Sequence, residues 1–162
     1  WEQYRHVIFD VTDERFDASY APLFRRVSGA IAVTSESAES LFVLNRLLRA
    51  ILIGADEQRM RIKVLGVINN RSVNPAPFLR YTQRTRAFPL LTIPERPELA
   101  ALRHFHRTLL ALDHEPPELK PVVDGFIRIA DLLRVDPFVL YPLSPLPDEE
   151  IWKLEPAMSL PS

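Results

Sequence analysis

Apolar residues along the chain fall into short continuous runs, which alternate with longer stretches where they recur every three or four positions. The short runs are rich in Val and Ile and predict buried strands over Arg5–Phe9, Ala30–Thr34, Ile62–Ile68 and Leu90–Ile93. The periodic stretches predict helices over Ser37–Ile53, Pro75–Arg86 and Leu119–Leu133. Because strands and helices alternate, the pattern predicts a three-layer α/β fold with a mainly parallel sheet flanked by helices.

Helix ends and the last part of the chain add further signals. Ser35 and Ser37 are candidate N-caps of the first helix, and Gly54 is its expected end. Prolines cluster after residue 136, which predicts an extended tail with a short helical turn near Asp148–Leu154. The tail is also rich in apolar side chains, so we expect it to pack on this domain or on a partner. The expected division is an α/β half domain over residues 1–135 and a Pro-rich tail over residues 136–162.

Composition narrows the function classes. With 162 residues, 47% of them hydrophobic and 25% charged, the chain is typical of one globular domain. It holds no cysteine, which excludes a disulfide, a thiolate zinc site and a cysteine-held iron–sulfur cluster within this chain. No apolar run reaches the roughly 18 residues of a membrane helix, and a cytoplasmic location is the expectation. The glycines, at positions 29, 54, 66 and 125, cannot build either of the common glycine-rich phosphate-binding motifs.

Charge is unevenly distributed although the net charge is −1. Residues 59–107 hold ten Lys/Arg against two Glu, whereas residues 108–162 hold four against ten acidic residues. A solvated face with internal salt bridges is the simplest interpretation, and a docking surface for an acidic partner is the next. Nucleic acid is the least favoured partner because aromatic residues are not interleaved with the basic positions. The candidate docking residues are Arg80, Arg84, Arg103 and Arg107.

Candidate site residues follow three of the predicted strands at the point where each strand ends. Asp10 follows the first strand, Asn70 and Arg71 follow the third, and Pro94 and Glu95 follow the fourth. In open parallel sheets, ligands bind outside the carboxyl ends of the strands, so these residues form one candidate site. Asp10 is either a magnesium ligand or a cap of the next turn. Asn70 either reads the edge of a purine through its amide or forms a plain turn.

No catalytic residue is assigned from the sequence. His104, His106 and His114 have a poor spacing for a metal site, because residues two apart on a helix point away from each other. No order of Ser, His and Asp stands out, and a thiol nucleophile is excluded.

The order of these segments resembles the C-terminal half of the nitrogenase iron protein family, which includes the ATP-binding subunit of light-independent protochlorophyllide reductase. The resemblance covers nearly the whole chain. The motifs that carry it are Val7-Ile8-Phe9-Asp10-Val11, Tyr20-Ala21-Pro22-Leu23, Ala38–Ile51, Leu65–Arg71, Phe88–Pro94 and Ile129-Ala130-Asp131-Leu132.

The resemblance implies half of a P-loop ATPase fold, related also to the ParA and MinD positioning ATPases. By matching position, Asp10 would be the acid on the magnesium side, Asn70 an adenine contact, and Pro94 with the residues after it the lining of the base. Residues 11–17 would form the switch that reports the γ-phosphate. The cysteine that holds the family's cluster falls on Asp17 here, and a glycine of its switch falls on Asp13. The family's P-loop half has no counterpart in this sequence.

These observations favour a degenerate module of that family, a pseudoenzyme that acts as a partner-binding or regulatory subunit and is not catalytic alone. Its expected cofactor is at most ATP with magnesium, and its expected assembly is a homodimer or a complex with a P-loop-bearing chain or a reductase component. Two alternatives stay open within the P-loop class: a fragment or split half of an active ATP-dependent reductase component, and a positioning ATPase. A small α/β interaction domain unrelated to ATP is the remaining one.

Overall fold

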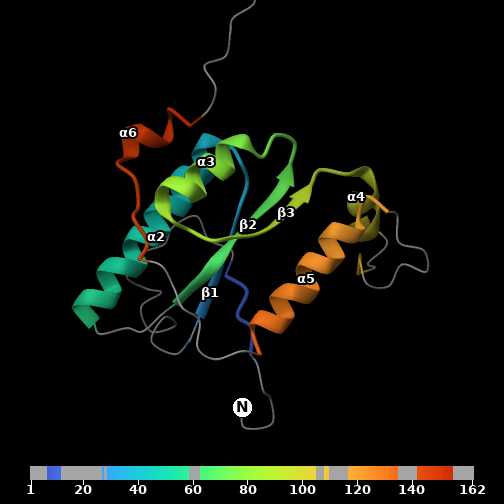
Figure 1. Cartoon of the computed structure of the whole chain (residues 1–162), viewed down its shortest axis with the longest axis horizontal. Coiled ribbons are helices and arrows are strands. Elements are labelled where there is room, and N and C mark those ends of the chain that lie inside the picture. Colours follow the sequence, from blue (N-terminus) through green and yellow to red (C-terminus); the bar gives the residue numbers. More distant parts are fainter. Residues whose placement is uncertain are drawn as a thin grey trace, which may run out of the picture.

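The computed structural model describes residues 7–11, 27, 29–58, 63–104, 108–109, 117–134 and 142–154 (Figure 1). Its strands are β1 (Gly29–Thr34), β2 (Lys63–Ser72) and β3 (Pro89–Pro94), and its helices are α2 (Ala38–Gln58), α3 (Ala76–Thr85), α4 (Pro97–His104), α5 (Lys120–Leu132) and α6 (Asp148–Ile151). The strands form a parallel sheet in the order β1-β2-β3. The α/β architecture expected from the pattern is therefore confirmed, and it is consistent with half of a P-loop ATPase fold.

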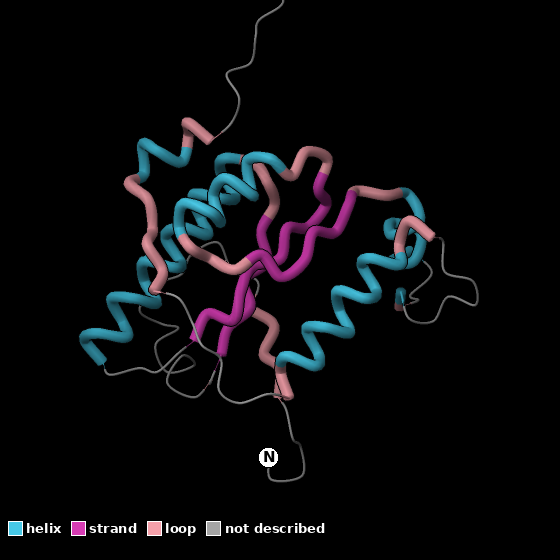
Figure 2. The backbone as a smooth tube through the Cα atoms, viewed as in Figure 1, coloured by secondary structure: helices cyan, strands magenta, loops and turns pink. Residues whose placement is uncertain are grey.

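Helices cover both faces of this sheet, which gives the three layers (Figure 2). Neighbouring residues of β2 point to opposite faces, as the pleat of a strand requires. Val67 belongs to a cluster with buried side chains of α2, α3 and the tail, whereas the next residue, Ile68, belongs to a second cluster with Val122 and Ile129 of α5. A strand with apolar residues on both faces reads as a continuous hydrophobic run, which is why the sequence shows no alternation there.

The first predicted strand, Arg5–Phe9, is described only from residue 7 onward, and this part is not a strand. Residues 7–11 have no strand structure and are not one of the strands of the described sheet, and the side chain of Ile8 is 83% exposed. The prediction of a strand over Arg5–Phe9 is thus wrong for Val7–Phe9. A run of Val, Ile and Phe has the propensity for a strand, but a strand also needs a neighbour to accept its backbone hydrogen bonds.

Helix α2 begins where the sequence indicates but ends later. The backbone N–H of Ser40 donates to Oγ of Ser37 at 3.3 Å, which is the geometry of an N-cap. The expected end at Gly54 is wrong, because the helix continues to Gln58. A glycine inside a helix costs only about 1 kcal/mol relative to alanine, and the Ala, Glu and Gln that follow favour continuation.

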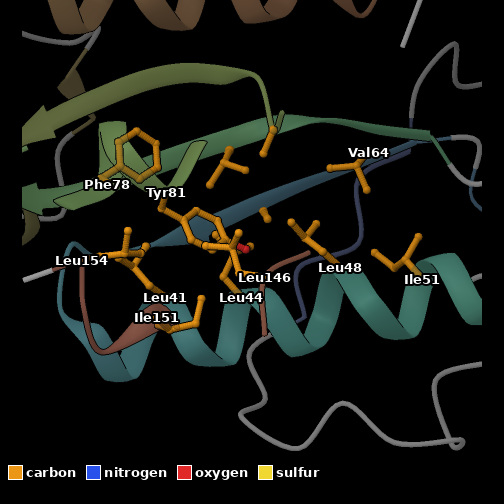
Figure 3. Packing of buried hydrophobic residues seen from close by; sticks show 13 residues of the cluster. Leu41, Leu44, Leu48, Ile51, Val64, Phe78, Tyr81, Leu146, Ile151 and Leu154 are labelled. Atoms are coloured by element: carbon orange, nitrogen blue, oxygen red, sulfur yellow. The ribbon is translucent and has the colours of Figure 1, made fainter. Parts of the chain in front are cut away.

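Residues 142–154 of the tail pack against α2 and α3. Leu146, Ile151 and Leu154 are buried in the same cluster as Leu48 of α2 and Tyr81 of α3 (Figure 3). Within this part of the tail, the expected helical turn is α6. The proposed division of the chain between residues 135 and 136 stays a prediction.

Polar contacts fix the register of the tail. The side-chain amide of Asn45 on α2 forms two hydrogen bonds with the backbone of Leu146. Its Nδ2 donates to the carbonyl at 2.8 Å, and its Oδ1 accepts from the N–H at 2.9 Å. The hydroxyl of Tyr81 also donates to Oδ1 of Asn45, at 3.3 Å. Arg49 donates to the same carbonyl and pairs with Asp148 at 2.9 Å. The tail is therefore held by directional bonds as well as by apolar burial.

Candidate functional site

The carboxyl ends of β2 and β3 lie side by side and bring four of the predicted site residues to one edge of the sheet. Ser72 at the end of β2 is the register partner of Pro94 at the end of β3, and the backbone N–H of Glu95 donates to the carbonyl of Ser72 at 2.9 Å. Asn70 and Arg71 directly precede Ser72 in the strand. Asn70, Arg71, Pro94 and Glu95 thus share one rim, which we call the β2–β3 rim.

Glu36, which lies between β1 and α2, binds this rim through its carboxylate. Oε2 accepts from Oγ of Ser72 at 2.6 Å and from Nδ2 of Asn69 at 3.2 Å. Oε1 accepts from the backbone N–H groups of Val73 at 2.7 Å and of Asn74 at 2.6 Å. One carboxylate therefore connects the end of β1 to the strand end and the following turn of β2.

The hydrogen bonds decide the ionisation of Glu36. Burial raises the pKa of its carboxyl group, but the bonds from Asn74, Ser72, Val73 and Asn69 lower it, and the pKa ends below its ordinary value of 4.5. Glu36 is thus a carboxylate at neutral pH. Its charge is spread over donors of the rim.

Arg71 has an unusual backbone. Its φ angle is +56°, in the left-handed region that non-glycine residues rarely occupy. The ladder between β2 and β3 is irregular between Asn69 and Ser72, where Arg71 lies. The side chain of Arg71 is exposed, and no ion pair to it occurs among the described residues. A cationic group is therefore presented at the rim without a neutralising partner from the described part of the chain.

The two asparagines of β2 differ in burial. Asn69 is fully buried, and while its Nδ2 is committed to Glu36, its Oδ1 accepts no hydrogen bond from any residue that the structure describes. Asn70 is half-buried at the rim. An amide in that position can both donate and accept, which is the pattern needed to read a purine edge.

The remaining predicted site residues are placed elsewhere or not described. Asp10 lies in the irregular segment 7–11, is exposed, and takes part in no hydrogen bond or ion pair among the described residues. Its assignment as a magnesium ligand stays a prediction. No group of three His, Asp or Glu side chains that could hold a metal ion occurs in the described ranges.

The structure describes only some of the proposed docking arginines. Arg80 is exposed on α3. Arg84, on the same helix, pairs with Glu150 of α6, which is an internal salt bridge between the basic and the acidic parts of the chain. Arg103 lies in α4, and Arg107 lies outside the described residues. The docking role of these residues stays a prediction.

Sequence reasoning missed Glu36. The signal was present, because an acidic residue stands between a strand end and a helix start, on the edge of the sheet where ligands bind. The serines around it drew attention to helix capping instead. Only the folded chain shows that the acid reaches the next strand along the sheet.

Comparison with known proteins adds the evidence of homology. No family model matches the chain. The curated relatives include proteins named light-independent protochlorophyllide reductase iron-sulfur ATP-binding protein from Halorhodospira halophila, Cereibacter sphaeroides and Rhodospirillum rubrum, at 32%, 27% and 29% identity over 150 residues. Each match covers 91% of this chain, and the matches cover 48%, 48% and 50% of the respective relatives. The chain is homologous to these ATP-binding proteins.

This homology confirms the resemblance to the nitrogenase iron protein family drawn from the motifs. The chain spans about half the length of the curated relatives it matches, which is consistent with the expected C-terminal half. The relatives are named as iron–sulfur proteins, whereas this chain contains no cysteine, so its residues do not fit a thiolate-held cluster. None of the described helices is long and apolar enough to span a membrane.

Proposed function

We propose that the β2–β3 rim binds the base side of a purine nucleotide, and that the chain acts as a partner-binding or regulatory module rather than as an electron carrier. The observation that carries the proposal is the Glu36 carboxylate, which fixes the strand end where Asn70 and Arg71 meet Pro94 and Glu95. A pre-organised edge of this kind loses little conformational entropy when a ligand binds.

Each residue of the rim has a role that its chemistry supports. The Asn70 amide would exchange paired hydrogen bonds with the purine edge. Pro94 offers a rigid apolar surface beside the base, and the backbone around Glu95 is already held by Ser72. The exposed guanidinium of Arg71 would meet negative charge on the ligand. Bound magnesium would supply charge neutralisation at the phosphates, and Asp10 is the residue of this chain proposed to hold it.

The non-redox part of the proposal rests on the ligand chemistry of iron–sulfur clusters. These clusters are held by cysteine thiolates, and the chain has none to offer. A relative that keeps the fold and the rim but lacks the thiolate can still bind a nucleotide or a partner. The proposed partners are a second copy of this chain, a P-loop-bearing chain or a reductase component.

A second candidate function is favoured by the coverage of the relatives. The chain matches about half of proteins whose names describe an ATP-binding reductase subunit, so it would be one half of an active ATP-dependent reductase component. The two candidates differ in what they require. Only the active component must hold a cluster and hydrolyse ATP in its assembled form.

Calorimetry on the native full-length chain tests the nucleotide site. We expect ADP with magnesium to bind, and Asn70→Ala to weaken that binding about tenfold, which corresponds to about 1.4 kcal/mol. Gln83→Ala is the matched control, because Gln83 is an exposed amide on α3 away from the rim. Binding that is absent, or that is unchanged by Asn70→Ala, would refute the proposed site.

Cluster reconstitution separates the two candidate functions. The native chain, alone and in its native complex, is incubated anaerobically with iron and sulfide, and the visible absorbance and ATP hydrolysis are measured. The regulatory module gains no cluster absorbance from this chain and shows no hydrolysis alone. A complex in which this chain contributes to a reducible cluster and to ATP turnover would establish the reductase component instead.

A further inference from the structure

The left-handed residue Arg71 is bracketed by the hydrogen bonds of a single carboxylate. On one side, Glu36 accepts from Asn69 at 3.2 Å; on the other, it accepts from Ser72 at 2.6 Å and from the next two backbone N–H groups. Only residues 70 and 71 between these donors are not bound by it. We call Glu36 and the groups that donate to it the Glu36 clamp. The left-handed residue Arg71 lies between the donors of this clamp.

A left-handed backbone in a residue with a β-carbon costs about 1–3 kcal/mol and persists only where its surroundings over-determine it. Glu36 provides that constraint, because it binds the side chain of Asn69 before residue 71, and the Ser72 hydroxyl and two backbone N–H groups after it. The Ser72 carbonyl is held in addition by the N–H of Glu95 on β3. The conformation of Arg71 is therefore set by the clamp and not by its own preference.

We propose that Glu36 is a positioning residue of the β2–β3 rim, which holds Arg71 in its left-handed conformation so that the guanidinium meets the negative charge of a bound nucleotide. This inference rests on the proposed nucleotide function and names the residue that shapes the site. Glu36 does not itself contact the ligand, because both of its oxygens are used by donors of the clamp.

The charges at the rim support this division of roles. Arg71 is exposed and takes part in no described ion pair, so its guanidinium can form a fork with an anionic group. The charge of Glu36 is shared by donors that all lie in β2 and the turn after it. An unclamped Glu36 would be free to pair with a nearby cation, whereas the clamp keeps the carboxylate and Arg71 separate.

The test compares a charged and an uncharged ligand in a double-mutant cycle on the native full-length chain. ADP and adenosine are titrated into the wild type, Glu36→Gln, Arg71→Ala and the double variant. We expect Glu36→Gln to weaken ADP about tenfold and adenosine less than twofold. In the Arg71→Ala background, Glu36→Gln should have no further effect on ADP, because the residue that it positions is gone.

Two further variants keep the test decisive. Ser72→Ala removes one donor of the clamp but keeps the charge of Glu36, and we expect an intermediate loss of ADP affinity even if Glu36→Gln does not fold. Glu39→Gln is the matched control, because Glu39 is exposed in the first turn of α2 and has no hydrogen bond to a described residue.

The outcomes distinguish this inference from the function on which it rests. A wild type that binds neither ADP nor adenosine overturns the proposed function and the positioning role with it. A wild type that binds ADP, with losses from Glu36→Gln that are equal for adenosine or additive with Arg71→Ala, overturns the positioning role alone. Slower amide hydrogen exchange at Val73 and Asn74 in the wild type than in Glu36→Gln is the structural signature expected of the clamp.

Discussion

Single polar side chains specify the relative positions of distant segments in this molecule more strictly than its apolar core does. Asn45 and Glu36 each bind backbone groups of a distant segment, the tail in one case and the turn after β2 in the other. Apolar packing tolerates substitutions of similar volume, whereas such bonds specify one register. At the residue scale, these two side chains are therefore where substitutions are expected to be most informative.

Asn45→Ala removes three hydrogen bonds from a fully buried position. It leaves the backbone N–H of Leu146 and the hydroxyl of Tyr81 without their acceptor. Burial raises the pKa of Tyr81 well above its usual range, against an opposing effect of Arg49, so the hydroxyl stays a donor and stays unsatisfied. We expect the free energy of unfolding to fall by about 2–3 kcal/mol in urea titrations. Gln83→Ala, an exposed amide, should leave it within about 0.5 kcal/mol.

Glu36 makes stability depend on pH in a defined direction. Because hydrogen bonds hold the pKa of its carboxyl group below 4.5 in the folded chain, its contribution is fully present above that value and is lost as the pH falls through the lowered pKa. The difference in unfolding free energy between the wild type and Glu36→Gln should be constant near pH 7 and shrink below pH 4.5. A difference that grows on acidification would contradict the hydrogen-bonded carboxylate.

Gly66 is the one glycine of the sheet that the backbone requires. Its φ angle is +154°, and a β-carbon there would come within 2.6 Å of the carbonyl oxygen of Phe88. We expect Gly66→Ala to lower the free energy of unfolding by about 1–3 kcal/mol. Gly29→Ala is the matched control, since its β-carbon meets only the flexible side chain of Leu65, at 3.0 Å, and its loss should be smaller.

At the element scale, the sequence predicts those helices and strands whose own residues carry a clear periodicity or composition. Helix α5 and strand β3 fall within a residue or two of their predicted bounds, because their periodicity and composition agree with their burial. The local signal fails for two features. The segment 7–11 has the composition of a strand but no strand structure, and α4 is short and weakly amphipathic and has no predicted counterpart.

The candidate site also has one part that the sequence predicts and one part that it does not. That Asn70 and Pro94 come to one edge follows from the parallel topology, which the alternation of elements predicts. The Glu36 clamp depends on how far the loop after β1 reaches across the sheet. That reach is a property of the folded backbone, and no local pattern encodes it.

Helix α6 and the residues around it illustrate how an element too short to be stable alone is held by its neighbours. Ile151 is fully buried in the core cluster, while Trp152 beside it is 52% exposed and stacks on Phe42 with ring centroids 5.9 Å apart. We expect Ile151→Ala to lower the unfolding free energy by about 2–5 kcal/mol and Trp152→Ala by about 0.5–1.5 kcal/mol. Equal losses for the two would show that the tail does not pack as described.

For the whole molecule, the central question is whether the layers on the two faces of the sheet unfold together. Val67 and Ile68 are adjacent in β2 but belong to different clusters, so any loss of β2 removes support from both layers. We therefore expect one cooperative transition. The alternative is a stable layer of α2, α3 and the tail with an α5 layer that opens first.

Leu48→Ala on α2 and Ile129→Ala on α5 separate these possibilities, because each removes a buried side chain from one face only. Each should lower the free energy of unfolding by about 2–5 kcal/mol without changing the slope of the urea titration. The two losses should add within about 0.5 kcal/mol, since the sheet lies between the sites.

Tryptophan fluorescence and far-ultraviolet circular dichroism are followed in parallel. An early transition seen only in circular dichroism for Ile129→Ala would mean that the α5 layer unfolds by itself.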